Sequence, residues 1–474
     1  MNKILYIFNN LILIYAIILC VSYLILAVIS AFSLIRYKRK NSFVDYNVIL
    51  SSPLAPTISI IAPAFNESKS IVDNIRAILA LHYNHFEVII INDGSKDDTL
   101  EKMIKVYELE KVEYSYKPVL PTQEIKGIYK SVNHSFANLT IIDKVNGGKA
   151  DALNAGLNIS GNDFYVAMDV DSVIEPDALL KLVKPIMEST DRRVIGTGGV
   201  IRIANSCKII NGHIVDVEVP KNLLARFQVL EYTRSFLMGR IAWSKINGIL
   251  IVSGALGLFD KQVVIKCGGY NPNTVGEDME LVVRMRRYMY EQDIKHKIEY
   301  IPDPLCWTEA PTSLKILGRQ RNRWTRGTMD SLFIHKKIFM NYKYVKMGMI
   351  GHPFWLFFEW LAPIIECLGI IYFLVLWYLG QINWPFFLLL LAFVYLFSVA
   401  FTSYAILYDE LTFQRYKGRV QVMTLFLTTF IDPIIYHPLT LFWSIWGNIS
   451  YLKGSKSWGE QERKGFVMKK RNSK

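Results

Sequence analysis

The residues most suited to chemistry in this sequence are two carboxylates, Asp169 and Asp171, directly after the strand-like run at residues 163–168. Alternate residues of a strand point to the same side, so both carboxylates can converge on one cation. Hard oxygen ligands suit Mg²⁺ or Mn²⁺, and such an ion can neutralise a diphosphate leaving group. An Asp-x-Asp pair alone is more often part of a solvated loop, so the reading needs support from the rest of the chain.

A second candidate for phosphate chemistry is Gly147-Gly148-Lys149, which opens a helix-like segment. Backbone N–H groups at a helix start, together with a lysine, can bind phosphate. The segment is not a P-loop, because no Ser or Thr follows the lysine and the upstream glycine is missing. Taken by itself it predicts only the start of a helix.

Polar clusters also follow two other apolar runs: Asn66-Glu67 follows residues 57–63, and the cluster at residues 92–95, which contains Asp93, follows residues 86–91. Each has a simpler interpretation, since Asn66 and Ser95 could cap helices and Asp93-Gly94 could form an ordinary turn. All three clusters nevertheless stand at the ends of apolar runs. That coincidence is more informative than any one of them.

The elements that would position these residues alternate between two types. Strand-like runs occupy residues 57–63, 86–91, 139–142 and 163–168, and helix-like patterns occupy residues 67–81, 97–109 and 148–159. Such alternation predicts βαβ units, a mostly parallel sheet and helices on both of its faces. Ligands of such sheets bind beyond the carboxyl ends of the strands, which is where the polar clusters fall.

The N-terminal segment predicts a membrane span. Residues 11–35 carry no charge and are followed at once by Arg36, Lys38, Arg39 and Lys40. This length crosses a hydrocarbon core of about 30 Å, and the flanking cations favour the cytoplasmic side. A cleaved signal peptide is rejected, because its apolar core would be shorter. The chain after residue 40 is therefore expected in the cytoplasm.

The last third of the chain is apolar again. Residues 384–408 form a second uncharged run, and residues 360–379 are long enough to span, with Glu366 either inside the membrane or near its interface. Residues 418–452 are interrupted by Asp432-Pro433 and His437-Pro438, so they predict one kinked span or interfacial helices. Because the basic tail at residues 453–474 is expected in the cytoplasm, the charge rule favours the interfacial alternative.

The composition agrees with this layout. The 474 residues are 51% hydrophobic and 20% charged, with a formal net charge of +13. A chain this apolar and basic is typical of a membrane protein with a folded cytoplasmic part, and disorder, collagen and a disulfide scaffold are excluded. The five cysteines show no paired spacing, which fits a reducing cytosol. Nucleic-acid binding is disfavoured, because the clearest cation clusters flank membrane segments.

Six segments occur in one order that resembles a known family. They are Ala62-Pro-Ala-Phe-Asn-Glu67, Asn92-Asp-Gly-Ser-Lys-Asp-Asp-Thr99, Gly147-Gly-Lys-Ala-Asp-Ala-Leu-Asn154, Asp169-Val-Asp171, Gly276-Glu-Asp278 and Gln320-Arg-Asn-Arg-Trp324. Together they resemble the family-2 processive glycosyltransferases, the membrane synthases of cellulose, hyaluronan, chitin and poly-N-acetylglucosamine. The resemblance covers roughly residues 55–465. It implies an α/β GT-A fold, Rossmann-like with a mostly parallel sheet, plus an α-helical transmembrane region.

The resemblance also implies roles for single residues. Glu67 and Asp93 would hold the uridine, Lys149 would lie near the nucleotide, Asp169 would contact it, and Asp171 would bind the diphosphate and the metal ion, Mg²⁺ or Mn²⁺. Asp278 would be the general base, with Gly276 replacing the family's threonine. An alternative is that Asp278 is only the N-cap of a helix.

The acceptor side follows from the same resemblance. Ser253, Gly254 and Glu277 would contact the acceptor sugar or the diphosphate, as would Gln320, Arg323 and Trp324. The last three stand at i, i+3 and i+4, on one helical face, and an amphipathic membrane-surface helix is the alternative. Trp458 and Arg463 resemble a gating loop that closes over the nucleotide, although two residues are added and a threonine is missing.

The resulting hypothesis is an inverting, processive β-glycan synthase in a bacterial-type plasma membrane, multi-pass with its catalytic domain in the cytoplasm. Its partners would be a UDP-sugar donor, the nascent polysaccharide, the lipid bilayer, and a second copy or an accessory membrane subunit. The alternatives are single-sugar transfer to a polyprenyl phosphate or other lipid, and a non-catalytic assembly subunit. The expected divisions are residues 1–40 (N-terminal span), 52–312 (GT-A domain), 313–345 (interface helices), 346–452 (membrane region) and 453–474 (basic tail). The stretch at residues 114–138 could be a lid or partner-binding loop.

Overall fold

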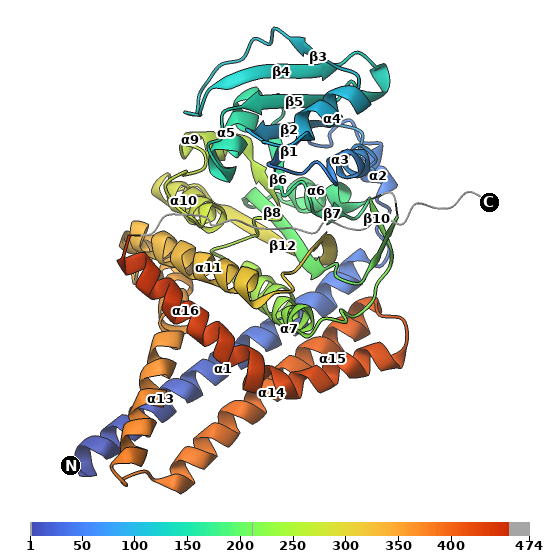
Figure 1. The fold of residues 1–474 in the computed structure, drawn as a ribbon. Coiled ribbons are helices and arrows are strands. Elements are labelled where there is room, and N and C mark those ends of the chain that lie inside the picture. The colour runs from blue at the N-terminus through green and yellow to red at the C-terminus, as the bar shows by residue number, and fades with distance from the viewer. Residues whose placement is uncertain (1, 211, 455–474) are drawn as a thin grey trace.

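The computed structural model describes residues 2–210 and 212–454, in which a large sheet stands on a group of long helices (Figure 1). The sheet has ten described strands in the order β3-β4-β5-β2-β1-β6-β11-β8-β12-β7. Their bounds are β1 Ile58–Ala64, β2 Phe86–Asp93, β3 Leu109–Val112, β4 Ile125–Ser131, β5 Leu139–Lys144, β6 Phe164–Met168, β7 Val173–Ile174, β8 Arg193–Ile203, β11 Leu256–Asp260 and β12 His296–Thr308. A separate hairpin pairs β9 Lys208–Ile210 with β10 His213–Asp216.

The predicted parallel sheet is present at its centre. Strands β5, β2, β1 and β6 pair in parallel, with Ile58 of β1 opposite Phe86 of β2 and Phe164 of β6. Strand β11 is antiparallel to β6 and β8, so the sheet as a whole is mixed. Residues of β1 are buried on both of its faces, which explains why the sequence shows a continuous apolar run there rather than an alternating one.

Helices cover both faces of the sheet, with α3 and α6 on one side and α5 and α10 on the other (Figure 1). In α3 the buried residues Ile71, Ile75 and Ile78 recur at helical spacing, which gives an apolar stripe toward the sheet. The helices of this domain are α2 Asn47–Leu50, α3 Ile71–Leu79, α4 Thr99–Val106, α5 Lys149–Ile159, α6 Ala178–Glu188, α7 Leu223–Tyr232, α8 Ile241–Lys245, α9 Lys261–Lys266 and α10 Glu277–Glu291, with a 3₁₀ turn at η1 His134–Phe136 and a π-helix at η2 Thr233–Arg240.

The stretch at residues 114–138 contributes one strand to the sheet, β4 Ile125–Ser131. Its strand β4 pairs antiparallel with both β3 and β5 and so extends the edge of the sheet. The preceding loop is fixed to α5, because the backbone N–H groups of Val119 and Leu120 donate to Asn158 Oδ1 at 3.1 and 2.9 Å. The lid or partner loop suggested by the sequence thus contains one strand of the sheet, β4, between loop segments.

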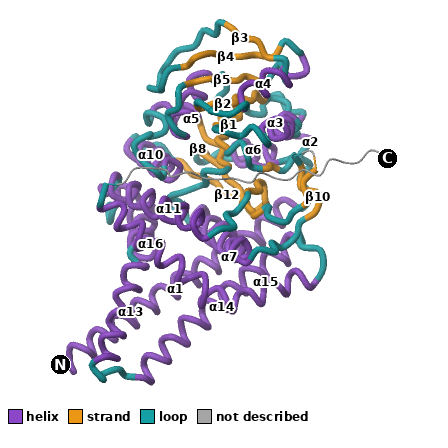
Figure 2. The backbone as a smooth tube through the Cα atoms, in the orientation of Figure 1, coloured by secondary structure: helices purple, strands orange, loops and turns teal. Residues whose placement is uncertain are grey.

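Four described helical segments are long and apolar enough to cross a membrane: Tyr6–Asn41, Met347–Tyr378, Trp384–Phe413 and Arg419–Leu452. The elements of these segments and of their border with the sheet are α1 Asn2–Asn41, α11 Leu314–Ile334, η3 Lys336–Ile338, η4 Tyr342–Tyr344, η5 Met347–Gly351, α12 His352–Phe354, η6 Trp355–Trp360, α13 Ala362–Tyr378, α14 Trp384–Phe413, α15 Arg419–Ile431, η7 Asp432–Tyr436 and α16 His437–Leu452. The N-terminal part of α1, α13 and the start of α14 lie farthest from the sheet, whereas α16 runs close to α11 (Figure 2).

The interruption predicted near residue 433 is a π-helical turn, η7, rather than an end of the helix. The chain therefore runs from α15 through η7 into α16, and α16 packs along α11 (Figure 1). At this contact a Cβ added to Gly318 of α11 would lie 2.6 Å from Trp443 Nε1 of α16. Glu366 of α13 pairs with His437, whose Nε2 lies 2.8 and 3.0 Å from the two carboxylate oxygens.

Candidate active site

The loops that follow β1 and β2 are joined by hydrogen bonds. Asn66 N donates to Ser95 Oγ at 3.0 Å, and Asn66 Oδ1 accepts from the backbone N–H of Lys96 at 2.8 Å. Glu67 N donates to Thr99 Oγ1 at 3.0 Å. The capping alternative is wrong for Asn66 and Ser95, because α3 and α4 begin later, at Ile71 and Thr99. The two polar clusters instead form one hydrogen-bonded pair of loops at the carboxyl ends of β1 and β2.

Asp93, at the end of β2, anchors the start of α5. Its Oδ1 accepts from Lys144 Nζ at 2.7 Å and from Gly147 N at 3.0 Å, and its Oδ2 accepts from Gly148 N at 2.8 Å. Lys144 is fully buried and also pairs with Asp151 Oδ1 at 2.5 Å. The carboxylate predicted to meet the nucleotide thus also fixes the glycine turn, and sequence reasoning missed the lysine that neutralises it.

Gly147 and Gly148 are required by this geometry. A Cβ at Gly147 would lie 2.4 Å from Asp151 Oδ1, and Gly148 has a φ of +85°, a region that L side chains rarely adopt. Gly148 is the N-cap of α5, so the helix starts at Lys149 as the sequence predicts. The turn therefore presents Lys149 at the first position of the helix.

Lys149 connects three parts of the site. Its Nζ lies 2.5 Å from Asp169 Oδ1 after β6, donates to the Gly254 carbonyl at 2.8 Å, and lies 3.9 Å from Glu277 Oε1 of α10. Burial alone lowers the pKa of this ammonium, but the carboxylates of Asp169 and Glu277 outweigh it and the net pKa is raised. The lysine is therefore held in its charged form where a diphosphate would need positive charge.

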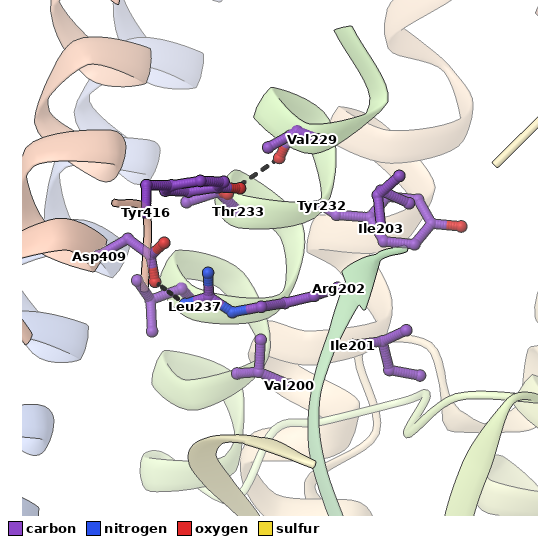
Figure 3. Close-up of a pocket in the computed structure, with 10 residues that line it drawn as sticks. All are labelled: Val200, Ile201, Arg202, Ile203, Val229, Tyr232, Thr233, Leu237, Asp409 and Tyr416. Atoms are coloured by element: carbon purple, nitrogen blue, oxygen red, sulfur yellow. Dashed lines mark hydrogen bonds and ion pairs between the residues drawn. The ribbon is translucent and has the colours of Figure 1, made fainter. Parts of the chain in front are cut away.

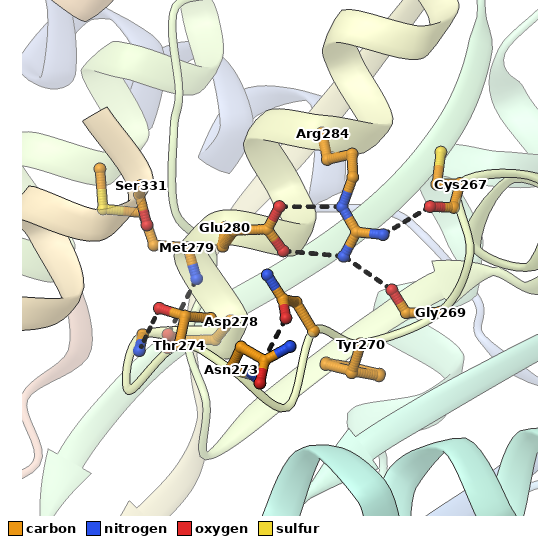
Figure 4. Close-up of polar contacts among 12 residues, drawn as sticks. Cys267, Gly269, Tyr270, Asn273, Thr274, Asp278, Met279, Glu280, Arg284 and Ser331 are labelled. Carbon is orange, nitrogen blue, oxygen red and sulfur yellow. Dashed lines mark hydrogen bonds and ion pairs between the residues drawn. The ribbon is translucent and has the colours of Figure 1, made fainter. Parts of the chain in front are cut away.

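The predicted base lies beside the predicted acceptor element. A Cβ built on Gly254 would be 3.1 Å from Asp278 Oδ2 and 3.4 Å from Lys149 Nζ, so both side chains lie close to this glycine. Asp278 Oδ1 accepts from Met279 N at 2.8 Å (Figure 4). The N-cap of α10 is Gly276 and the helix begins at Glu277, so the alternative that Asp278 is only an N-cap is wrong.

Glu277 is the buried carboxylate of the site, with 3% of its surface exposed. Burial is the main cause that raises the pKa of Glu277 to about 7; Lys149 opposes the shift and Asp278 adds to it. Arg323 of α11 also lies close enough to act on this carboxyl. Glu277 therefore stands between the lysine of α5 and the arginine of the Gln-x-x-Arg-Trp segment.

Helix α10, which carries Asp278, is fixed by a network one turn further along (Figure 4). Glu280 accepts from Arg284 Nε and Nη2 at 2.9 and 2.7 Å, and Arg284 also donates to the Gly269 carbonyl at 2.7 Å. His335 Nε2 lies 3.0 Å from Glu280 Oε1. Burial raises the pKa of Glu280, but these hydrogen bonds outweigh it and the net pKa is lowered. Sequence reasoning did not single out this network.

The Gln-x-x-Arg-Trp residues lie on α11, as predicted. This helix meets the start of α10, where Gly327 contacts Gly276. Trp324 is 39% exposed, and the guanidinium of Arg321 lies over its ring at 4.1 Å from the centroid. Gln320 shares this helix face. The gating-loop residues Trp458 and Arg463 lie outside the described residues.

A family model described as "Glycosyltransferase like family 2" matches residues 55–327, more than half of the chain. The chain belongs to glycosyltransferase-like family 2. The matched range contains the loops after β1, β2 and β6, both glycines of the α5 turn, Asp278 and the Gln-x-x-Arg-Trp residues. The resemblance stated from the sequence is thereby confirmed at the level of the family.

Among curated proteins, this family-2 chain is similar to poly-β-1,6-N-acetyl-D-glucosamine synthases. It is 28% identical over 275 residues to one from Staphylococcus epidermidis, covering 58% of this chain and 55% of the relative. It is 27% identical over 277 residues to one from Staphylococcus aureus (strain COL), with the same coverage of 58% and 55%. The chain therefore spans about half the length of the curated relatives that it matches.

Two solved structures of glycosyltransferases are also similar. The mannosyltransferase PcManGT from Pyrobaculum calidifontis has a TM-score of 0.46 at 16% identity, covering 92% of this chain and 99% of that one. TarS from S. aureus has a TM-score of 0.37 at 14% identity, covering 60% and 40%.

The metal expected from Asp169-x-Asp171 fits the residues of this family-2 chain by its chemistry. Within the described ranges, no group of three or more His, Cys, Asp or Glu side chains surrounds one point. Mg²⁺ is usually held by one or two carboxylates together with substrate phosphates and water, which matches a two-carboxylate site of this kind. Asp171 is the residue best suited to such an ion, because Asp169 already pairs with Lys149.

The family-2 domain is also tied to the long helices by a buried ion pair (Figure 3). Arg202 of β8 donates from Nη2 to Asp409 Oδ1 of α14 at 2.5 Å. Its guanidinium also lies 5.8 Å from the ring centroid of Trp307 and 5.6 Å from that of Phe413. Separating β8 from α14 would leave both charges buried without a partner, which is costly. The ion pair therefore favours one arrangement of the sheet relative to α14.

Proposed function

We propose that this protein is a membrane-embedded inverting glycosyltransferase that transfers sugar from a UDP-sugar to a growing polysaccharide. The observation that carries the proposal is the arrangement of Asp278, Gly254 and Lys149, in which a carboxylate and a cation both lie next to the Cα atom of one glycine. Such a site offers a base that can deprotonate the acceptor hydroxyl and a positive charge that can stabilise the departing diphosphate.

The chemistry assigned to these residues is a single displacement. Asp278 accepts the proton of an acceptor hydroxyl while that oxygen bonds to the anomeric carbon of the donor. The bond between this carbon and the diphosphate oxygen breaks, and UDP leaves with the electron pair. Lys149 stabilises the negative charge that develops on the diphosphate.

On the donor side, Glu67 and Asp93 would hold the uridine, Asp169 would contact the nucleotide, and Asp171 would bind the diphosphate together with the metal ion. Mg²⁺ or Mn²⁺, when bound through Asp171, would neutralise part of the diphosphate charge. The Asp93–Lys144–Asp151 cluster supports this side by fixing the turn before Lys149.

On the acceptor side, Ser253, Gly254 and Glu277 would line the position of the sugar hydroxyl, next to Asp278. Gln320, Arg323 and Trp324 would contact the diphosphate and the sugar ring, because α11 meets α10 at Gly276 and Gly327. The four apolar helical segments would hold the catalytic domain at the cytoplasmic face of the membrane and give the polymer a route across it.

The donor to test first is UDP-N-acetylglucosamine, because the similar staphylococcal proteins are named for a polymer of N-acetylglucosamine. Purified full-length protein in detergent, supplied with this donor and Mg²⁺ or Mn²⁺, should release UDP and form a product of many sugars. A panel of other UDP-sugars provides the comparison. Absence of UDP release with every donor contradicts the proposal, and a product with only one added sugar contradicts the polymerising part of it.

A further inference from the structure

Residue Arg321 lies inside the Gln-x-x-Arg-Trp segment at a position to which neither the motif nor the proposed mechanism assigns a role. It is buried, with 5% of its surface exposed, although Trp324 on the next turn of α11 is 39% exposed. A buried guanidinium needs a partner for its charge, so its surroundings indicate what it holds in place.

The partners of Arg321 come from two other elements. Its Nη2 donates to Glu231 Oε2 of α7 at 2.7 Å and to the Tyr436 hydroxyl of η7 at 3.1 Å. The Tyr436 hydroxyl in turn donates to Glu231 Oε2 at 2.7 Å. The three side chains thus form a closed triangle of hydrogen bonds, which holds Nη2 of the guanidinium in place.

The guanidinium held in this way contacts Trp324. The Arg321 guanidinium lies over the indole at 4.1 Å from the ring centroid, a cation–π distance. The ring of Tyr232 lies 6.5 Å from the indole. One face of the indole is therefore covered, while 39% of the residue remains exposed for a ligand.

The π-helical turn η7 brings Tyr436 to this position. Its ring stacks on Phe227 of α7 at 5.1 Å, and Asp432, at the start of the same turn, pairs with Arg234 Nη1 at 2.9 Å. Two residues one turn apart in η7 therefore hold adjacent parts of α7 and η2. This explains in structural terms why the last apolar segment carries a polar interruption.

We propose that Arg321, Glu231 and Tyr436 are positioning residues that hold Trp324 against the acceptor sugar, so that the turn η7 of the last membrane segment controls how firmly the growing polymer is retained. This inference rests on the proposed function. It assigns no chemical step to the three residues, which act through the indole of Trp324.

The test uses the full-length protein in detergent with UDP-N-acetylglucosamine and Mg²⁺, and measures product length, donor KM and melting temperature. Tyr436→Phe removes one hydroxyl and keeps the stack on Phe227, and Arg321→Lys keeps the charge but loses the planar group. Both variants should shorten the median product by about threefold or more and leave the donor KM within about twofold. Tyr395→Phe is the matched control, because its hydroxyl only donates to the Phe430 carbonyl.

A second comparison separates positioning from general packing. In a Trp324→Leu background, which lacks an aromatic face, Tyr436→Phe should shorten the product no further. Equal shortening in both backgrounds contradicts the inference, as does an unchanged product in Tyr436→Phe and Arg321→Lys. If the parent protein polymerises and both variants give products of the parent length, only this inference is contradicted. If the parent protein releases no UDP, the proposed function itself is contradicted.

Discussion

Gly276 and Gly327 meet backbone to backbone: a Cβ added at Gly276 would lie only 2.6 Å from the Cα atom of Gly327. Gly276 precedes the first residue of α10, which carries Asp278, and Gly327 lies on α11, which carries Trp324. The related motif has threonine where this chain has Gly276, and the contact gives a steric reason for the difference. The close approach joins the proposed base to the proposed acceptor helix.

Gly276→Ala should therefore destabilise the protein. The added methyl meets backbone that cannot move aside without separating α10 from α11, and such overpacking typically costs about 1–3 kcal/mol. The measurement is the melting temperature of the purified protein in detergent. Gly369→Ala on α13 is the control, because nothing lies within 4 Å of its added Cβ, and it should not lower the melting temperature.

Gly254→Ala should impair catalysis more than stability. Its Cβ would lie 3.1 Å from Asp278 Oδ2, so this carboxylate must shift slightly where the acceptor would bind, and 3.4 Å from Lys149 Nζ, an ordinary contact distance. Because a misplacement of about 1 Å can cost about 100-fold in rate, this smaller shift should reduce the rate by about tenfold. UDP release at saturating donor measures the effect. Gly161→Ala, whose Cβ would approach only Glu87 at 3.9 Å, should release UDP at the parent rate.

Asp93→Asn should lower stability strongly. The substitution leaves the fully buried Lys144 with only Asp151 as a counter-charge, and breaking a buried ion pair costs about 3–5 kcal/mol. Thermal unfolding of the two proteins in the same detergent gives the comparison. Asp45→Asn, at an exposed position before α2, is the control. An Asp93→Asn protein as stable as its parent would show that Lys144 does not depend on this carboxylate.

Glu277 should make stability depend on pH. Its pKa in the folded protein, about 7, lies above its ordinary value of 4.5, so the folded state binds the proton more tightly than the unfolded state does. The stabilisation by the protonated form is therefore complete below the ordinary value and is lost as the pH rises through about 7. Glu277→Gln cannot ionise, so its melting temperature relative to the parent should rise between about pH 5 and pH 8. A constant difference over this range contradicts the raised pKa.

Much of the fold could be predicted because its signals are local. The runs that form β1, β2, β5 and β6 are mostly apolar, as expected of strands buried on both faces. The start of helix α5 at Lys149 could also be predicted, because Gly147 and Gly148 directly precede it. Strand β4, which pairs between β3 and β5, could not be predicted in this way, since most of its residues are only partly buried and it carries no continuous apolar run.

The residues of the candidate site also fall into those that the sequence could predict and those that it could not. The grouping of Lys149, Asp169, Gly254 and Asp278 agrees with expectations from ordered motifs and from the rule that ligands bind at the carboxyl ends of strands. The supporting partners could not be predicted, because they are far away in the sequence. Arg321 and Tyr436, for example, are 115 residues apart, and nothing local in either segment indicates their hydrogen bond.

The most direct test of the proposed reaction compares Asp278→Asn with Asp293→Asn in UDP release from UDP-N-acetylglucosamine. Asp278 is the second residue of α10, and Asp293 lies exposed beyond the end of the same helix. If Asp278 is the base, its substitution should reduce UDP release by about 100-fold or more while the melting temperature stays unchanged, and Asp293→Asn should behave as the parent. Parent-like UDP release by a folded Asp278→Asn protein would contradict the central claim.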